Sequence, residues 1–312
     1  MKDFARWLFW VRLRQALRAD RPGRLQALYP LWRAQEMLAG AQRQLMRQEL
    51  LACFGGAPVG DAYRVAWRVH TEELLLGRLG PDTVKHYIRF AGRQNLDEAL
   101  ASGRGVVLVY PHSGNVMLMI ALLAHSGYRY VQFAARGLAP EDVARANPET
   151  FGHNRWREEV RRTREAHEDR VPAEYVTHPR GLVRALREGA IAGIAYDGRL
   201  GSRFEPVTYL GRQALLSTGP WKLARQTGAL LLPVFNECPR QGLNICHVGP
   251  TCSGRDDALT WLQERLREHA GHYGLWLAHC RERRATDDHP LFVDYAPDEA
   301  WRRWTTGTDP GF

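Results

Sequence analysis

The chain has 312 residues, of which 45% are hydrophobic and 25% are charged, and its formal net charge at pH 7 is +9. This composition excludes a disordered chain and supplies a large core, either as one α/β domain or as one domain with an appendage. Lys2, Lys85 and Lys222 are the lysines, so nearly all of the 43 basic residues are arginines. Such a basic chain suits an anionic partner: a membrane surface, a phosphorylated cofactor, an acidic carrier protein or nucleic acid.

The first residues form an amphipathic pattern. Phe4, Trp7, Leu8 and Val11 recur at helical spacing and are interleaved with arginines. The apolar run is far shorter than the roughly 20 residues of a membrane span, and no signal-peptide cleavage pattern follows it. The pattern therefore predicts either a helix on an anionic membrane surface or a helix packed on its own domain.

Residues 1–97 are predicted to be mainly helical. Apolar and charged residues alternate at intervals of three and four over 42–51, 63–76 and 81–90. From Leu96 onward the pattern changes to helix, strand, turn and helix. A strand over 106–110, a helix over 117–124 and a strand over 130–134 together predict a βαβ unit.

The same alternation continues after a charged segment at 141–170, which we expect to be a solvated helix or a lid over the site. Further helices are predicted over 180–188, within the segment 215–227 and over 258–269, and further strands over 190–196, 229–235 and 244–248. Turns are expected at 197–199 and 208–211. The sequence therefore predicts an α/β fold, with a mixed or largely parallel central sheet flanked by helices.

The five cysteines form no CxxC pair and no regular framework. A structural zinc site and a disulfide scaffold are therefore not indicated, and buried free thiols in a reducing cytosol are the natural interpretation. No metal ligand set is predicted. Nucleic-acid binding would depend on charge alone, because no recognition motif accompanies it, and we expect none.

His112 follows the strand over 106–110 directly, within the short polar stretch Pro111–Asn115. It therefore lies at the carboxyl end of a strand, where ligands bind in open α/β sheets, and just before a helix N-terminus with free N–H groups. Ser113 lacks the Gly-x-Ser-x-Gly context of a nucleophile. Asn115 is placed to cap the helix or to donate to an oxyanion.

Several segments in this order resemble the bacterial late acyltransferases of lipid A biosynthesis and their mannoside-acylating relatives. They are GRGVVLVYPHSGN, then Arg136, then LVRALREGAIAGIAYDGR, YLGRQALLSTGPWKLARQTGALLLPVF and HYGLWLAHCRER, and together they cover most of residues 40–284. The resemblance implies a glycerolipid acyltransferase-like fold and transfer of an acyl group from an acyl carrier protein or coenzyme A thioester to a hydroxyl or amine. It implies no further cofactor.

In that family a histidine followed five residues later by Asp or Glu carries the chemistry. His112, Gly114 and Asn115 match this motif, but Met117 stands where the acid is expected. A general base needs a carboxylate to orient its ring and to stabilise the imidazolium, and methionine does neither.

Three explanations are open. Asp197, which also ends a predicted strand, supplies the carboxylate or is only a turn residue; or His112 acts alone on an easier reaction; or the site is inactive and the fold binds an acyl chain or a carrier protein.

Substrate contacts are also expected, and the resemblance implies the first of them. Arg136 matches an arginine near a phosphate-bearing ligand, Arg199 follows the turn after Asp197, and Met117 with its apolar neighbours lines an acyl groove or belongs to the core. The predicted catalytic residues are thus His112 and Asp197, and the predicted substrate-binding residues are Ser113, Gly114, Asn115, Met117, Arg136 and Arg199.

We expect three regions: a helical N-terminal region over 1–97 that packs on the core, an acyltransferase-like core over 98–284 and a tail over 285–312. The predicted function is acyl transfer to a lipid, glycolipid or specialised metabolite with His112 as general base; the alternative is an inactive homologue that binds an acyl chain or carrier protein. The expected location is the cytoplasm, as a peripheral protein on the cytoplasmic face of the inner membrane.

Overall fold

The fold is taken from a computed structural model that describes residues 4, 7–13, 40–56, 59–73, 75–133, 155–199, 203–282 and 290–295. Its centre is a twisted sheet in the strand order β1-β9-β8-β2-β5-β3-β4. The strands are β1 (Ile88–Ala91), β2 (Val106–Tyr110), β3 (Tyr130–Phe133), β4 (Glu174–Val176), β5 (Ile191–Ala195), β8 (Leu230–Glu237) and β9 (Asn244–Val248). The chain is therefore an α/β protein, as predicted.

The sheet is parallel except for one pairing. β2 pairs in parallel with both β5 and β8, whereas β9 runs antiparallel to β8 and β1 runs parallel to β9. All five residues of β2 are buried, which explains their continuous aliphatic character. Val106, Leu108 and Tyr110 face one core cluster, and Val107 and Val109 face the other, so the period of two assigns each side chain to a layer.

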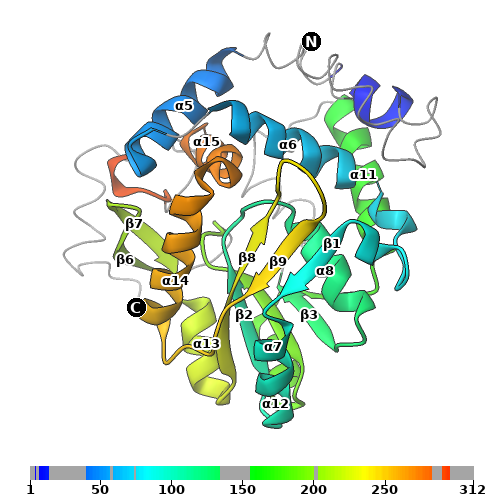
Figure 1. The fold of residues 1–312 in the computed structure, drawn as a ribbon, viewed down its shortest axis with the longest axis vertical. Coiled ribbons are helices and arrows are strands. Elements are labelled where there is room, and N and C mark those ends of the chain that lie inside the picture. Colours follow the sequence, from blue (N-terminus) through cyan, green and yellow to red (C-terminus); the bar gives the residue numbers. More distant parts are fainter. Residues whose placement is uncertain are drawn as a thin grey trace.

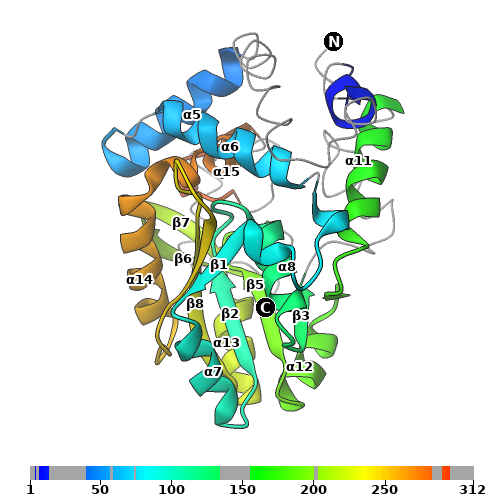
Figure 2. The ribbon, with the colours of Figure 1, turned by 45° about the vertical axis from the view of Figure 1, so that its right-hand side comes forward.

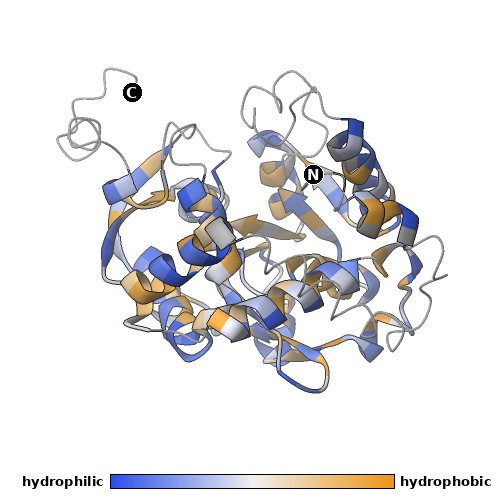
Figure 3. Ribbon diagram, turned by 90° about the horizontal axis from the view of Figure 1, so that it is seen from above, coloured by the Kyte–Doolittle hydropathy of each residue, from blue (hydrophilic) through white to orange (hydrophobic). Residues whose placement is uncertain are grey.

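Helices cover both faces of the sheet (Figure 1). One layer contains α7 (Arg93–Ala101) and α8 (Val116–His125), whose buried residues belong to the first core cluster. The other contains α12 (Pro179–Arg187), α13 (Gly219–Thr227) and α14 (Arg255–Glu268), whose leucines belong to the second. Hydrophobic and hydrophilic residues share most of the helices in Figure 3, as expected for helices that bury one side.

A third group of helices lies beyond the carboxyl end of β2 (Figure 2). It comprises α5 (Gly40–Phe54), α6 (Val59–Glu73) and α15 (Gly274–Glu282), with the 3₁₀ turn η4 (Ala270–His272) before α15. Gly274 is buried where α15 meets α5 and α6, and a Cβ there would lie within 3.2 Å of Met46, Leu50 and Ala62 atoms. Helices that are more than 200 residues apart in the sequence therefore pack together above the sheet.

Two short segments differ from the prediction. The helix expected over residues 81–90 is wrong: only the turn η3 (Val84–His86) is helical, and β1 follows it at the sheet edge. The hairpin of β6 (Phe204–Tyr209) and β7 (Arg212–Ser217) was not predicted as strands, although the turn between them was. Leu291 and Phe292, within the expected tail, are fully buried against this hairpin.

The charged segment contains α11 (Arg155–Glu168), and the N-terminal segment contains the π-helical turn η1 (Leu8–Leu13). Trp7 stacks on Phe4, lies against Trp156 of α11 and donates from Nε1 to Glu159 at 2.6 Å. This side of the segment therefore packs on its own chain, while Phe4 and Leu8 remain 46% and 48% exposed. The prediction for 141–170 was a solvated helix or a lid, and residues 141–154 of that segment lie outside the described residues.

Candidate active site

His112 lies in the loop between β2 and α8, at the carboxyl edge of the sheet. The loop turns sharply because the Ser113 N–H donates to the Pro111 carbonyl at 2.7 Å and Gly114 adopts a left-handed conformation with φ of 58°. A Cβ at Gly114 would lie 2.2 Å from the Asn236 carbonyl oxygen, so only glycine fits. The His112 side chain is 34% exposed, so part of the imidazole is open to solvent.

Asp197 lies directly against the ring. It follows β5, the neighbour of β2, and its Oδ1 is 2.6 Å from His112 Nδ1. Its Oδ2 accepts the backbone N–H of the same histidine at 2.9 Å. Because an ionised carboxylate only accepts hydrogen bonds, the contact assigns the proton to Nδ1 and leaves the lone pair on Nε2.

The segment 272–276 completes the surroundings of this pair. Tyr273 donates its hydroxyl to Asp197 Oδ2 at 2.8 Å, and the Trp276 ring stacks on the imidazole with centroids 3.8 Å apart and planes 14° apart. The His272 carbonyl accepts the Gly114 N–H at 3.3 Å. Burial, together with the charge of Asp197, holds the pKa of Tyr273 well above its usual range, so the phenol keeps the proton that it donates.

Asp197 is itself fully buried. Its two oxygens have three donors: the His112 imidazole, the His112 backbone and the Tyr273 phenol. These bonds replace the hydration that the carboxylate loses in the interior. The acid is therefore held in one orientation, with one oxygen facing the ring.

Asn115 is hydrogen-bonded within the fold. Its Oδ1 caps α8 by accepting the Leu118 N–H at 3.0 Å, and its Nδ2 donates to Glu72 of α6 at 3.1 Å. Glu72 also accepts from Asn244 at 2.8 Å and from Arg68 at 2.7 Å. Burial raises the pKa of Glu72, and the nearby Arg68 charge opposes that rise. Asn115 is therefore the helix cap that the sequence allowed, and because it is buried its amide is not presented to an oxyanion.

The other predicted contacts differ in accessibility. Ser113 is fully buried, so its hydroxyl is not presented to a substrate. Met117, in the first turn of α8, is partly buried and packs against the first core cluster. Arg199 donates to the Asp197 carbonyl at 3.2 Å and to the Leu215 carbonyl at 2.9 Å, and it stacks over Phe204, so it braces the turn that carries Asp197. Arg136 lies outside the described residues.

The remaining titratable groups do not form a second reactive centre in the described parts of the chain. Burial raises the pKa of Cys53 and Cys252 to about 11 and that of Cys238 and Cys246 to about 12, so these thiols are protonated at neutral pH. Across the described ranges, no three His, Cys, Asp or Glu side chains are grouped to hold a metal ion. No helix in those ranges is long and apolar enough to cross a membrane.

Glu72, Tyr273 and Trp276 were not among the sequence-predicted site residues. Glu72 lies 43 residues before Asn115, and Tyr273 lies 76 residues after Asp197. Only the resemblance, whose final segment HYGLWLAHCRER includes Tyr273 and Trp276, indicated the second region. Their side chains reach the site because α6 and α15 pack over the carboxyl edge of the sheet.

The arrangement can serve as a general base. A partly exposed imidazole has its Nδ1 against a buried carboxylate, which can stabilise the protonated ring and leave Nε2 to accept a proton. The first turn of α8 begins four residues after His112 and carries N–H groups at Val116 and Met117 that precede any intrahelical acceptor. Such groups stabilise negative charge on a nearby oxygen.

Comparison with known proteins identifies the family of the chain. Residues 59–259 match the family model for bacterial lipid A biosynthesis acyltransferases. Because this match spans more than half of the chain, the chain belongs to that family. It is therefore a member of a family of acyltransferases of lipid biosynthesis.

Among solved structures, the chain is similar to the 1-acyl-sn-glycerophosphate acyltransferase PlsC from Thermotoga maritima. The sequence identity is 12%, the match covers 66% of this chain and 80% of that chain, and the TM-score is 0.34. A search of curated proteins finds no match to this sequence.

Proposed function

We propose that the chain transfers an acyl group from an acyl carrier protein or coenzyme A thioester to a hydroxyl or amine of a lipid, glycolipid or specialised metabolite. The observation that carries this proposal is the 2.6 Å contact between His112 Nδ1 and the buried Asp197 carboxylate. Asp197 thereby provides the carboxylate that the family motif has at the position of Met117. Of the three explanations open from the sequence, it favours Asp197 as the substitute.

The steps follow from the tautomer. Nε2 of His112 accepts the proton of the acceptor hydroxyl or amine as its oxygen or nitrogen attacks the thioester carbonyl. The resulting imidazolium is stabilised by Asp197, and the N–H groups at the start of α8 stabilise the oxyanion. When the tetrahedral intermediate collapses, the C–S bond breaks, and the imidazolium returns the proton to the departing thiolate. The base is restored, and the products are an ester or amide and a free thiol.

Two features support an anionic donor and a membrane location. The net charge of +9 favours the phosphorylated arm of coenzyme A or an acidic carrier protein. The exposed Phe4 and Leu8 stand beside the exposed Arg12 on the N-terminal segment, a pairing that suits an anionic lipid surface. We accordingly assign the chain to the cytoplasmic face of the membrane as a peripheral protein. Leu8→Glu should reduce its sedimentation with anionic vesicles, whereas the exposed Leu51→Glu should not.

The activity test uses the purified full chain with lauroyl coenzyme A or an acylated carrier protein and a panel of hydroxyl- and amine-bearing lipids. Release of free thiol and the mass of the acylated product are measured. His112→Asn is the informative variant, because its amide still donates to Asp197 but cannot act as a base. General-base removal should slow transfer by about 100- to 10,000-fold. The exposed His178→Asn is the matched control, and its rate should equal that of the wild type.

The alternative, an inactive homologue that binds an acyl chain or carrier protein, rests on Met117 in the motif. It predicts retention of the acyl chain, without thiol release, on wild type and His112→Asn alike. Transfer that survives His112→Asn would remove the histidine from its proposed role. In the absence of any acceptor-dependent thiol release, retained acyl chain would establish the alternative.

A further inference from the structure

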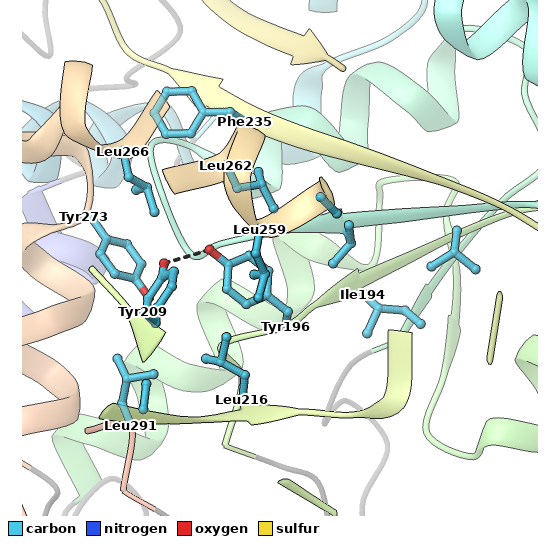
Figure 4. Close-up of a cluster of buried hydrophobic side chains, with 14 of the residues drawn as sticks. Ile194, Tyr196, Tyr209, Leu216, Phe235, Leu259, Leu262, Leu266, Tyr273 and Leu291 are labelled. Atoms are coloured by element: carbon cyan, nitrogen blue, oxygen red, sulfur yellow. Dashed lines mark hydrogen bonds between the residues drawn. The ribbon is translucent and has the colours of Figure 1, made fainter. Parts of the chain in front are cut away.

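Three buried phenols lie in a row behind Asp197. The Tyr196 and Tyr209 hydroxyls are 2.7 Å apart, and Tyr209 is also hydrogen-bonded to Tyr273, whose hydroxyl donates to Asp197 Oδ2. Figure 4 shows Tyr273 beside Tyr209 and the bond from Tyr209 to Tyr196, enclosed by leucines. All three side chains are fully buried. We call Tyr196, Tyr209 and Tyr273 the tyrosine row.

The row joins separate parts of the chain. Tyr196 precedes Asp197 at the end of β5, Tyr209 ends β6 of the hairpin, and Tyr273 precedes α15. Burial is the main reason that the pKa of each phenol lies well above its usual range, and the charge of Asp197 raises each further. The hydroxyls therefore stay protonated, and each proton is available for donation along the row toward the carboxylate.

Asp197 needs this support for a geometric reason. Its Oδ1 faces the imidazole, and among the described residues its Oδ2 accepts from the His112 backbone N–H and the Tyr273 hydroxyl. Without the phenol, one donor alone would fix Oδ2 in a site that water does not reach. Rotation of the carboxylate would then cost less, and Oδ1 would lose its alignment with Nδ1.

Trp276 restrains the other member of the pair. Its ring covers one face of the imidazole at 3.8 Å, so the histidine cannot rotate about its side-chain bonds without losing the stack. Tyr273 and Trp276 both lie beyond residues 59–259, the part of the chain that matches the family model. The restraint on the acid and the restraint on the base therefore come from one segment outside that region.

We propose that Tyr273, backed by Tyr209 and Tyr196, and Trp276 are positioning residues that hold Asp197 and His112 in the geometry for base catalysis. This inference deepens the proposed function and rests on it. The reactivity of the His112 imidazole then depends on the Tyr273 hydroxyl, which contacts Asp197 and not the ring. This dependence can be measured without knowledge of the acyl acceptor.

The test compares Tyr273→Phe with Tyr130→Phe. Tyr130 is a matched control, because it is also a buried phenol and its hydroxyl donates to Gln132 rather than to Asp197. Full chains are treated with diethyl pyrocarbonate from pH 5 to pH 9, and mass spectrometry of the His112 peptide gives its modification rate. No substrate is required, so failure of this test is distinct from failure of the proposed function.

Tyr273→Phe removes the phenol that holds Oδ2, so the carboxylate is less firmly aligned with Nδ1 and stabilises the protonated imidazole less. The midpoint of the His112 modification profile should therefore move downward, whereas Tyr130→Phe should leave it at the wild-type value. In the thiol-release assay, Tyr273→Phe should lower kcat by about 10- to 100-fold with little change in KM, as expected for a misplaced base.

Trp276→Phe provides a second variant that keeps part of the stack. It should increase the modification rate of the neutral imidazole, because the covered face becomes accessible. The proposal would be overturned if the pH profile of His112 modification in Tyr273→Phe coincided with those of the wild type and Tyr130→Phe. It would also be overturned if Trp276→Phe left the modification rate of His112 unchanged. Equal loss of kcat in Tyr273→Phe and Tyr130→Phe would reduce Tyr273 to a general packing role.

Discussion

Asp197→Asn probes the pair at the centre of the site with the smallest change in shape. Asn replaces one carboxylate oxygen with an amide NH₂ and keeps the volume. The NH₂ cannot occupy the Oδ2 position, because two donors, the His112 N–H at 2.9 Å and the Tyr273 hydroxyl at 2.8 Å, already point there. The amide must therefore direct its NH₂ toward His112 Nδ1.

This orientation reverses the tautomer of the ring. Nδ1 now accepts a hydrogen bond, the ring proton moves to Nε2, and the edge that faces solvent loses its lone pair. The same substitution in a serine protease triad lowers kcat by about 10,000-fold, and we expect a loss of about 1,000- to 10,000-fold here. Each factor of ten corresponds to about 1.4 kcal/mol of barrier, so the loss is about 4–5.5 kcal/mol.

Single-turnover thiol release from lauroyl coenzyme A measures the effect on the chemical step. A urea unfolding curve provides the control. In Asp197→Asn the His112 backbone N–H and the Tyr273 hydroxyl still donate to the side-chain oxygen, and His112 Nδ1 accepts from the new NH₂ group, so the fold should persist. If Asp197→Asn retains more than a tenth of the wild-type kcat, the carboxylate does not set the tautomer, and the reasoning is refuted.

Three further predictions concern the framework of the site. Gly114→Ala should lower the free energy of unfolding by about 2–4 kcal/mol and impair transfer, because the new Cβ would meet the Asn236 carbonyl at 2.2 Å in a left-handed backbone. Burial and the neighbouring His269 lower the pKa of His272 from 6.5 to about 4 in the folded protein. As the pH falls the unfolded chain therefore binds this proton first, and about 2 kcal/mol of the free energy of unfolding present above pH 6.5 should be lost by pH 5. His272→Gln should remove this pH dependence, as measured by urea unfolding. Arg212→Ala should cost about 3–5 kcal/mol in the same assay, because Arg212 is bonded to the buried Glu49 at 2.8 Å.

Matched substitutions separate these causes from general effects. Gly103→Ala has the same backbone requirement, with φ of 73°, but no atom within 4 Å of its Cβ, so it should cost about 1–2 kcal/mol at most. His178→Gln, at an exposed site, should leave the pH dependence unchanged. Arg129→Ala breaks an exposed ion pair with Glu188 and should cost less than about 1 kcal/mol. Equal losses within any pair would contradict the corresponding explanation.

The long apolar runs made the sheet predictable. The five residues of β2 are all buried, and such a run between turn residues has few alternatives to a central strand. The strand Asn244–Val248 was predicted with its observed bounds. β1 was missed because Ile88–Ala91 is only four residues long and follows a helical turn, and its identity as a strand depends on its pairing with β9, 153 or more residues away.

The site was also predictable only in part, because some of its contacts depend on residues that are distant in the sequence. His112 and Asp197 each end a strand, and adjacent parallel strands bring such residues together, so the candidate pair followed from local patterns and strand ends. Tyr273 and Trp276 belong to the start of a helix, where apolar and aromatic residues normally form core. Only the packing of α15 over the sheet edge reveals that one donates to Asp197 and the other stacks on His112.

A double-mutant cycle on kcat tests most directly whether His112 and Asp197 act as one unit. The wild type, His112→Asn, Asp197→Asn and the double variant are compared in the thiol-release assay. If the acid acts only through the imidazole, the double variant should be no slower than His112→Asn alone, within a factor of about three. Losses that multiply, so that the double variant is slower than either single variant by the full effect of the other, would show that the two residues act independently and would contradict the account.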